Sequence, residues 1–185
     1  MEAYHIDRTA RIKQGVINAL DAEGRNEKAI QLLRHPQSPL KIVEDIFEKC
    51  RKEHYPSGVS RLKSLYATER FSVNRWVEKL GVIQNGLVNA LTNVCTIEVD
   101  GDYPVYDSVW FDLCWNSEKK LLGESIICRH AHCYWSAAQT ENPLIELLCP
   151  FPAEVIRLTT IGNFDIETEK MYHKYMNCSK APEQR

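Results

Sequence analysis

Several features that would assign a protein to a class at once are missing from this sequence of 185 residues. No apolar run approaches the ~20 residues that a membrane-spanning helix requires. The opening MEAYHIDRTA lacks the charged and then apolar layout of a secretion signal. The sequence contains no internal repeat, no low-complexity tract and no glycine-rich phosphate loop. The formal net charge of −2 gives no electrostatic argument for a nucleic-acid coat protein or a membrane binder. We therefore expect a cytoplasmic protein without a membrane partner.

Cysteine usage does not indicate a disulfide framework. The count of seven is odd, and a chain of this length does not need covalent staples, so a reducing compartment is favoured. With 44% hydrophobic and 26% charged residues, the chain can bury a sizeable core, and we expect a single domain over residues 1–185. The cysteines are Cys50, Cys95, Cys114, Cys128, Cys133, Cys149 and Cys178.

The first half of the chain shows mostly helical patterns. Two of the expected helices are separated by HPQSP, whose prolines forbid a continuous helix. In the second of these, Ile42, Ile46 and Cys50 are expected on the apolar side. The expected elements are a strand at Tyr4–Asp7, helices at 25–34 and 41–54, a strand at Ser64–Thr68, and helices at Glu69–Leu80 and Gln84–Asn93.

From Cys95 onward, short apolar pieces alternate with turn residues, which is typical of strands. Helices followed by hairpin-linked strands predict an α+β domain with a mostly antiparallel sheet rather than a βαβ repeat. The expected strands lie in CTIEV, GDYP, VWFDLCW, SIICRHAHCYWS, LIELLCPF and AEVIRLTTI.

The segment CRHAHC is the strongest candidate for a metal site. In a strand, alternation would place Cys128, His130 and His132 on one face. That gives three ligands, whereas a closed structural zinc site has four. We therefore expect no metal and keep a small metal-stabilised nucleic-acid-binding protein as an alternative. A cysteine nucleophile activated by a histidine is a further alternative, although no local signature marks one.

Two other places carry polar residues where apolar ones are expected. In SLYATERF, Tyr66 and Thr68 stand where a strand leads into a helix, which indicates either packing with a helix cap or a nucleotide pocket. In LIELL, Glu146 lies between Leu144 and Leu148 on one face of a strand. A carboxylate buried beside leucines needs a partner or a task.

Three separated segments resemble the ADP-ribosyltransferase superfamily, of the type of diphtheria toxin and the poly-ADP-ribose polymerases. They are YHIDRTARIKQG, SLYATERFSVNRW and LIELLCPFPAEVIRL, with His5, Tyr66 and Glu146 in the family's order. The resemblance implies a split, mostly antiparallel β-sheet and a helical insertion at about 18–60. The sequence lacks the Ser-Thr-Ser triplet, and Leu144 stands where an acidic residue would precede Glu146. These departures make the arginine-modifying toxin subgroup a poor match.

The resemblance also implies roles for individual residues, with NAD as the co-substrate. Glu146 would stabilise the positive charge that develops on the ribose, Tyr66 would stack on nicotinamide, and His5 would contact the adenosine ribose. By position, Arg8 or Arg61 would meet the pyrophosphate.

Two neighbours of Tyr66 complete the expected binding site. Thr68 would cap the helix that follows it. Trp76 would form a second wall of the site, unless it packs in the core.

We therefore predict an enzyme that transfers ADP-ribose from NAD to a macromolecular acceptor, either a nucleic acid or a protein. The size of the chain suits a toxin or an antiphage effector, which would have a neutralising partner protein. An inactive ADP-ribosyltransferase-like binding module is the main alternative.

Overall fold

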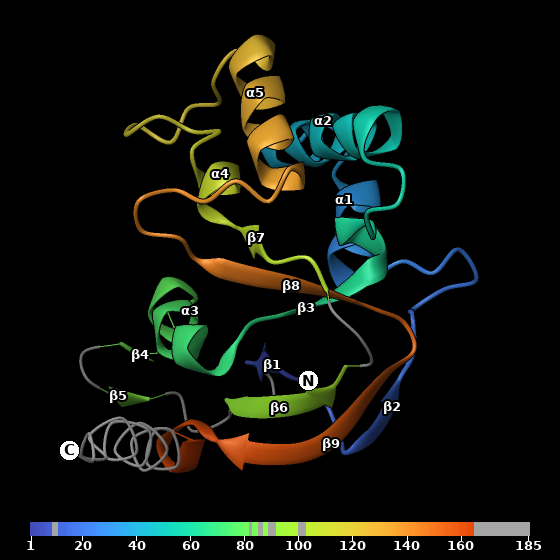
Figure 1. Ribbon diagram of the computed structural model, residues 1–185, viewed down its shortest axis with the longest axis vertical. Coiled ribbons are helices and arrows are strands. Elements are labelled where there is room, and N and C mark those ends of the chain that lie inside the picture. Colours follow the sequence, from blue (N-terminus) through green and yellow to red (C-terminus); the bar gives the residue numbers. More distant parts are fainter. Residues whose placement is uncertain (9–10, 82, 85–86, 89–91, 100–102, 165–185) are drawn as a thin grey trace, which may run out of the picture.

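The computed structural model describes residues 1–8, 11–81, 83–84, 87–88, 92–99 and 103–164 (Figure 1). Its helices are α1 (Glu27–Arg34), α2 (Pro39–His54), α3 (Val73–Lys79), α4 (Val109–Asp112) and α5 (Glu124–Trp135), with short 3-10 turns η1 (Arg61–Lys63) and η2 (Arg70–Ser72). Its strands are β1 (Glu2–Asp7), β2 (Gly15–Ile17), β3 (Ser64–Ala67), β4 (Ile83–Gln84), β5 (Leu87–Val88), β6 (Asn93–Glu98), β7 (Tyr106–Asp107), β8 (Ile145–Pro150) and β9 (Ala153–Thr160).

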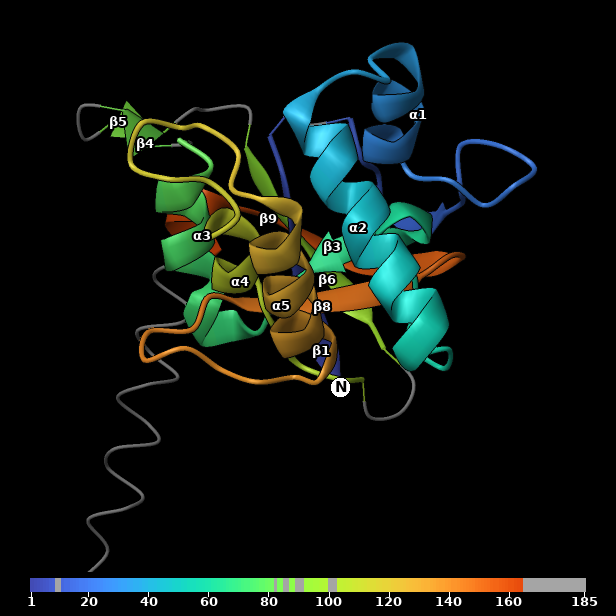
Figure 2. The ribbon, with the colours of Figure 1, turned by 90° about the horizontal axis from the view of Figure 1, so that it is seen from above.

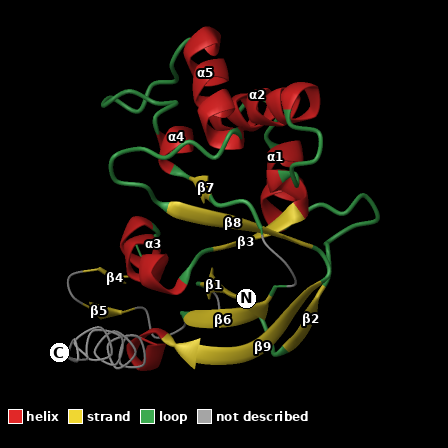
Figure 3. Cartoon of the chain, viewed as in Figure 1, coloured by secondary structure: helices red, strands yellow, loops and turns green. Residues whose placement is uncertain are grey.

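The long strands form two antiparallel sheets. One sheet has the order β1-β6-β9-β2, and the other has the order β3-β8-β7. An isolated antiparallel bridge between Tyr4 and Thr68 joins β1 to the chain just after β3. Figures 1 and 3 show α1, α2, α4 and α5 on one side of β3 and β8, with the four-stranded sheet on the other. The α+β class with antiparallel sheets is confirmed.

Local signals explain why the first two helices were predictable. The Asn26 side chain caps α1 by accepting a hydrogen bond from the amide of Ala29. Ser38 caps α2 in the same way, and Pro39 occupies the first helical position, where its missing N–H costs nothing. Viewed from above, α2 and α5 lie over β3 and β8 (Figure 2).

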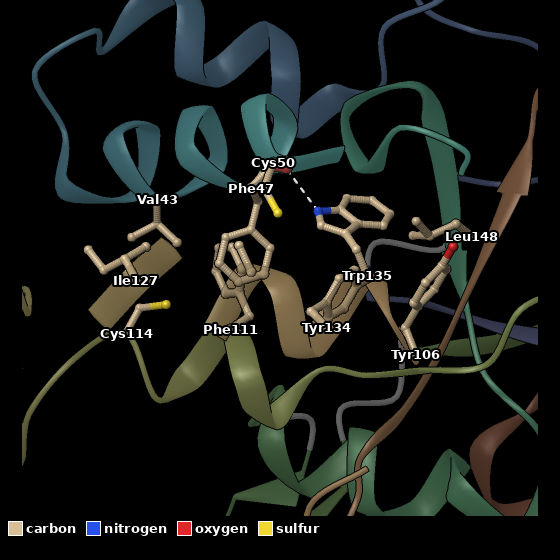
Figure 4. Close-up of a cluster of buried hydrophobic side chains, with 11 residues drawn as sticks. Val43, Phe47, Cys50, Tyr106, Phe111, Cys114, Ile127, Tyr134, Trp135 and Leu148 are labelled. Atoms are coloured by element: carbon tan, nitrogen blue, oxygen red, sulfur yellow. Dashed lines mark hydrogen bonds between the residues drawn. The ribbon is translucent and has the colours of Figure 1, made fainter. Parts of the chain in front are cut away.

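A hydrophobic core fills the layer between the helices and the three-stranded sheet (Figure 4). Phe47 of α2 packs against Phe111 and Tyr134, and the Trp135 indole donates to the Phe47 carbonyl oxygen over 2.8 Å. Each large apolar side chain buried there contributes on the order of 2 kcal/mol. A second core lies between the two sheets and includes Ala3, Leu65, Cys95, Leu147 and Val155.

Two of the expected strands are helices, and this part of the prediction is wrong. VWFDLCW contains α4 and SIICRHAHCYWS forms α5. In α5 the buried residues Ile127, Ala131, Tyr134 and Trp135 recur at helical spacing, so one helical face packs on α2. Because the apolar residues of this segment cluster at its two ends, they imitate two short strands.

Two further expectations need correction. The helix expected at Gln84–Asn93 is wrong where the structure describes it, since Gln84, Leu87–Val88 and Asn93 lie in β4, β5 and β6. The buried face of α2 consists of Val43, Glu44, Phe47 and Cys50, whereas Ile42 is exposed. In the part of the chain that the structure describes, no helix has the length and apolar character needed to cross a membrane.

Candidate active site

The residues that the resemblance singled out lie on three neighbouring strands, but only the Tyr66 and Glu146 side chains share a face. The Nδ1 atom of His5 on β1 lies 2.6 Å from the carbonyl oxygen of Tyr66 on β3, and β3 pairs with β8, which carries Glu146. The register pairs Tyr66 with Leu148 and Tyr106 with Glu146. Residues opposite each other in a sheet share a face, so the Tyr66 and Glu146 side chains both point toward the helices.

His5 belongs to the other layer. It alternates along β1 with Tyr4 and shares the face of Ala3, which is part of the core between the sheets. Burial lowers the pKa of His5, while its hydrogen bond to Tyr66 and the charge of Asp7 oppose the shift. A neutral imidazole is therefore favoured at pH 7, with Nδ1–H donating to the Tyr66 carbonyl oxygen.

Glu146 is 2% accessible and has two partners. The Arg61 guanidinium donates from Nη1 to Glu146 Oε1, and the Tyr134 hydroxyl donates to the same oxygen over 2.5 Å. Arg61 Nη1 also donates to the Tyr134 oxygen over 2.8 Å. A buried carboxylate is stable only with such partners, so its burial by itself is no argument for catalysis.

A second carboxylate completes what we call the charged cluster: Lys28, Glu44, Arg61 and Glu146. The Nε atom of Arg61 lies 3.3 Å from Glu44, and the Lys28 ammonium pairs with Glu44 directly. Burial raises the pKa of Glu44, but the charges of Arg61 and Lys28 outweigh it and leave the pKa lowered. Two positive and two negative charges thus balance in a nearly dry setting.

Aromatic rings surround the two cations. The Cζ atom of Arg61 lies 5.2 Å from the ring centre of Tyr66, 4.5 Å from that of Phe111 and 4.9 Å from that of Tyr134. The Nζ atom of Lys28 lies 5.3 Å from the Tyr66 ring and 4.6 Å from the Phe111 ring. These distances are within the range of cation–π attraction, so this wall of the site favours positive charge.

The hydroxyl oxygen of Tyr66 is buried and has no hydrogen-bond partner among the residues that the structure describes. Both amide hydrogens of the nearby Asn26 are already donated, to the carbonyl oxygens of Arg61 and Ser64. Burial raises the pKa values of Tyr66 and Tyr134 well above the ordinary range, so both stay protonated at neutral pH. Tyr66 therefore offers the site a ring face rather than a base.

The start of β8, which leads into Glu146, is fixed by three side chains. The Ile145 carbonyl oxygen accepts hydrogen bonds from the Thr68 hydroxyl at 2.7 Å and the Trp76 indole at 2.6 Å. The buried carboxylate of Asp107 accepts from the Leu144 amide at 2.9 Å. The prediction that Thr68 caps the following helix is wrong, because its hydroxyl is used on β8.

Of the remaining predicted residues, Arg8 lies apart from Glu146, and Arg61 and Trp76 make contacts other than those expected. Arg8 is exposed directly after β1. Arg61 holds the two carboxylates, so a contact with a pyrophosphate would require these ion pairs to be exchanged. Trp76 is partly buried, and its indole supports β8.

Sequence reasoning missed Lys28, Glu44 and Tyr134. A signal for Glu44 existed, since it lies one residue after Val43 and three before Phe47, on the face of α2 that helical spacing buries. Lys28 and Tyr134 join the cluster only through the packing of α1 and α5 onto the sheet, and their sequence positions carry no comparable signal.

The segment CRHAHC does not form a metal centre in this structure. As a helix it places Cys128 and His132 on one face, with His130 on another. Among the residues that the structure describes, no group of three His, Cys, Asp or Glu side chains is arranged to hold a metal ion. The His132 ring instead contacts the ring of His54 on α2, with 4.6 Å between centres.

Four of the thiols are poor nucleophiles. Burial raises the pKa of Cys50 and Cys149 to about 11 and that of Cys95 and Cys114 to about 12. The reactive form of cysteine is the thiolate, which such pKa values suppress at pH 7. A catalytic role for these four thiols is disfavoured.

The residues of the site all lie in the part of the chain that matches the model of one known family. The model of the family described as "Protein of unknown function (DUF2441)" matches residues 3–163. This span includes His5, Lys28, Glu44, Arg61, Tyr66, Tyr134 and Glu146. No curated protein matches the sequence.

Proposed function

Since the chain belongs to the DUF2441 family, whose description states no activity, we infer its function from the site and propose an NAD-dependent ADP-ribosyltransferase. The reaction would transfer ADP-ribose from NAD to a macromolecular acceptor and release nicotinamide.

One observation carries this proposal. Three residues far apart in the sequence, His5, Tyr66 and Glu146, lie on three strands that are neighbours in space, β1, β3 and β8. Their strands belong to two sheets, which the bridge between Tyr4 and Thr68 and the hydrogen bond of the His5 ring to the Tyr66 carbonyl oxygen connect; this arrangement agrees with the split antiparallel sheet that the resemblance implies. Residues 18–60, expected as a helical insertion, contain α1 and α2 and supply Lys28 and Glu44.

The chemistry of the cluster suits the cleavage of a cationic leaving group from a sugar. When the bond between the ribose carbon and the pyridinium nitrogen breaks, the electron pair leaves with nicotinamide and positive charge develops on the ribose. The carboxylate of Glu146 would stabilise this charge, and the Tyr66 ring would hold the pyridinium face. The acceptor would then attack the ribose carbon and lose its proton.

Arg61 has a positioning role in this proposal. Its ion pair with Glu146 fixes Oε1 beside Tyr134, and its second pair with Glu44 prevents the guanidinium from moving freely. A preorganised charge of this kind acts without reorganisation during the reaction. His5 would orient the adenosine side, from the adjacent strand.

The acceptor defines the biological role. A protein side chain or a nucleic-acid base would suit a toxin or an antiphage effector with a neutralising partner protein, as the resemblance implies. Incubation with labelled NAD and a cell extract, followed by nuclease or protease digestion, identifies the labelled acceptor class.

The direct test measures nicotinamide release from labelled NAD by the wild-type protein, Glu146→Gln and Glu154→Gln. Glu154 is the matched control because it is an exposed glutamate on the neighbouring strand in the sequence, β9. We expect Glu146→Gln to lower the rate by about 10²–10³, the loss typical of one stabilising group, and Glu154→Gln to leave it unchanged.

Stability must be measured in parallel, since Glu146→Gln also removes one of two negative charges beside Arg61. Breaking a buried ion pair costs about 3–5 kcal/mol of unfolding free energy, so circular dichroism must show that the variant is folded at the assay temperature. Near wild-type release by folded Glu146→Gln contradicts the proposal. No release by the wild-type protein favours the inactive binding module.

A further inference from the structure

The charged end of Lys28 is turned into the protein, which is unusual for a lysine. A quarter of its side chain is accessible, yet its ammonium is turned inward, to Glu44, whose side chain is 1% accessible. Lysine side chains normally bury the aliphatic stem and leave the charge in water. Burial accordingly lowers the pKa of Lys28, and Glu44 opposes that shift. The surroundings of this ammonium must therefore attract a cation strongly enough to offset the lost hydration.

The Lys28 ammonium has two kinds of neighbour, and we call the place that it occupies among them the slot. The rings of Tyr66 and Phe111 lie 5.3 and 4.6 Å from the Lys28 Nζ atom, and Glu44 supplies the negative charge. Ring faces and a carboxylate are the combination that recognises organic cations in proteins. A quarter of the Lys28 side chain is accessible, so this side chain extends from the surface to the slot.

The two cations of the cluster differ in how firmly they are held. Arg61 is 4% accessible at its side chain and bonds Glu146, Tyr134 and Glu44. Lys28 has one ion-pair partner, and its flexible stem reaches the surface. If Lys28 leaves, Glu44 is still paired with Arg61. Lys28 is the cation that can be exchanged.

We propose that the slot between Tyr66, Phe111 and Glu44 binds a planar organic cation, and that Lys28 occupies it as an internal competitor in the free protein. That the natural ligand is the pyridinium ring of NAD rests on the function proposed above. Binding of the ligand moves the Lys28 ammonium out into solvent. Because the ligand must displace this ammonium, its dissociation constant is higher than it would be without Lys28.

The test uses 1-methylnicotinamide, a permanent pyridinium cation, and nicotinamide, its neutral relative. Dissociation constants are measured by NMR titration for the wild-type protein, Lys28→Met and Lys28→Arg. Lys28→Met removes the competitor but keeps the apolar stem, whereas Lys28→Arg keeps a cation. Lys41→Met is the matched control, because Lys41 pairs with Asp45 on the surface of α2.

We expect Lys28→Met to bind 1-methylnicotinamide at least about fivefold more tightly, equivalent to about 1 kcal/mol. Lys28→Arg and Lys41→Met stay at the wild-type value, and nicotinamide gains nothing in any variant. If Lys28→Met is poorly folded, Lys28→Gln replaces it. Equal binding by wild type and Lys28→Met, or an equal gain for nicotinamide, overturns the proposal.

The two proposals fail separately. A gain in 1-methylnicotinamide binding by Lys28→Met without nicotinamide release from NAD by any variant supports the slot and contradicts the transferase. Release from NAD that depends on Glu146, combined with no gain in Lys28→Met, supports the transferase and overturns the slot. Chemical shift changes at the Tyr66 ring locate the ligand in the first case.

Discussion

Tyr66 combines a ring face against two cations with a hydroxyl that has no hydrogen bond. The two parts make opposite contributions to the protein. The ring gains from both cation–π contacts, whereas the buried hydroxyl has lost its water without a replacement. Substitutions that separate ring from hydroxyl therefore separate function from stability.

We predict that Tyr66→Phe keeps most of the nicotinamide release and raises the free energy of unfolding by up to about 1 kcal/mol. Tyr66→Ala should lose most of the release and about 3–5 kcal/mol of stability, since the ring and its packing are gone. Urea unfolding and the release assay measure the two effects. Equal loss of release in the two variants, with both folded, contradicts the stacking role.

His5 makes a prediction about pH. Its pKa in the folded protein is lowered from the ordinary 6.5, mainly by burial. Between the two pKa values the unfolded chain binds more protons than the folded one, so stability is present above about pH 6.5 and is lost as the pH falls below it.

We therefore expect the free energy of unfolding to decrease between pH 7 and pH 5, and less steeply in His5→Gln. His35→Gln is the control, because His35 is an exposed histidine between α1 and α2. The measurement is urea unfolding at several pH values. Parallel pH profiles for wild type and His5→Gln would show that His5 is not responsible.

At the scale of elements, the histidines and cysteines of CRHAHC belong to α5, a helix that is held by its packing. The helix packs on α2 through Ile127, Ala131, Tyr134 and Trp135, and Tyr134 reaches the charged cluster. Apolar packing and one buried phenol therefore hold this helix in place.

We predict that treatment with a chelator leaves the melting temperature unchanged. A structural metal contributes folding free energy directly, so its removal lowers the melting temperature of a protein that has one. Differential scanning calorimetry with and without EDTA measures this, and metal analysis of the same sample is the control. A drop of several degrees would show that CRHAHC carries a structural site after all.

Elements with local signals could be predicted, and those without could not. The caps at Asn26 and Ser38 are encoded within four residues of each helix start, and α1 and α2 were found where expected. The segment of α5 was predicted as a strand because its apolar residues form two pairs, Ile126 with Ile127 and Tyr134 with Trp135. Only the packing on α2 shows that the segment is a helix with one buried face. Alternation around Glu146 identified it as a buried acid, which the structure confirms.

The partners of Glu146 could not be predicted because they meet only in three dimensions. Arg61 lies 85 residues before Glu146, and Tyr134 lies 12 residues before it on another element. Glu44 reaches Arg61 across the contact between α2 and η1. The sequence indicated that a buried Glu146 needs a partner or a task, but residue types alone could not select a partner among the 23 lysines and arginines of the chain.

For the whole molecule, β8 connects two of the hydrophobic cores, the one beneath the helices and the one between the sheets. Leu148 lies in the core beneath the helices, while Leu147 and Cys149 lie in the core between the sheets. Alternate residues of one strand thus stabilise both, and neither core can lose β8 while the other stays intact.

We therefore predict a single cooperative unfolding transition. Tryptophan fluorescence reports the helical layer, where Trp135 is buried, and far-ultraviolet circular dichroism reports all elements. The two urea transitions should coincide in midpoint and slope. Two resolved transitions would mean that the helical insertion and the sheets unfold as independent units.

The bridge between the sheets consists of two reciprocal backbone hydrogen bonds, from the Tyr4 amide to Thr68 at 2.8 Å and from the Thr68 amide to Tyr4 at 2.9 Å, and the His5 ring adds a third bond, to the Tyr66 carbonyl oxygen. A long ladder opens only when many bonds break together, whereas a seam with so few bonds can open locally while each sheet stays whole. Deuterium uptake at these two amides would then outpace uptake in the middle of β6 and β8. His5 and Tyr66 lie on either side of this seam, so its local opening would also break the hydrogen bond between them, while the core between the sheets keeps the two halves of the site together.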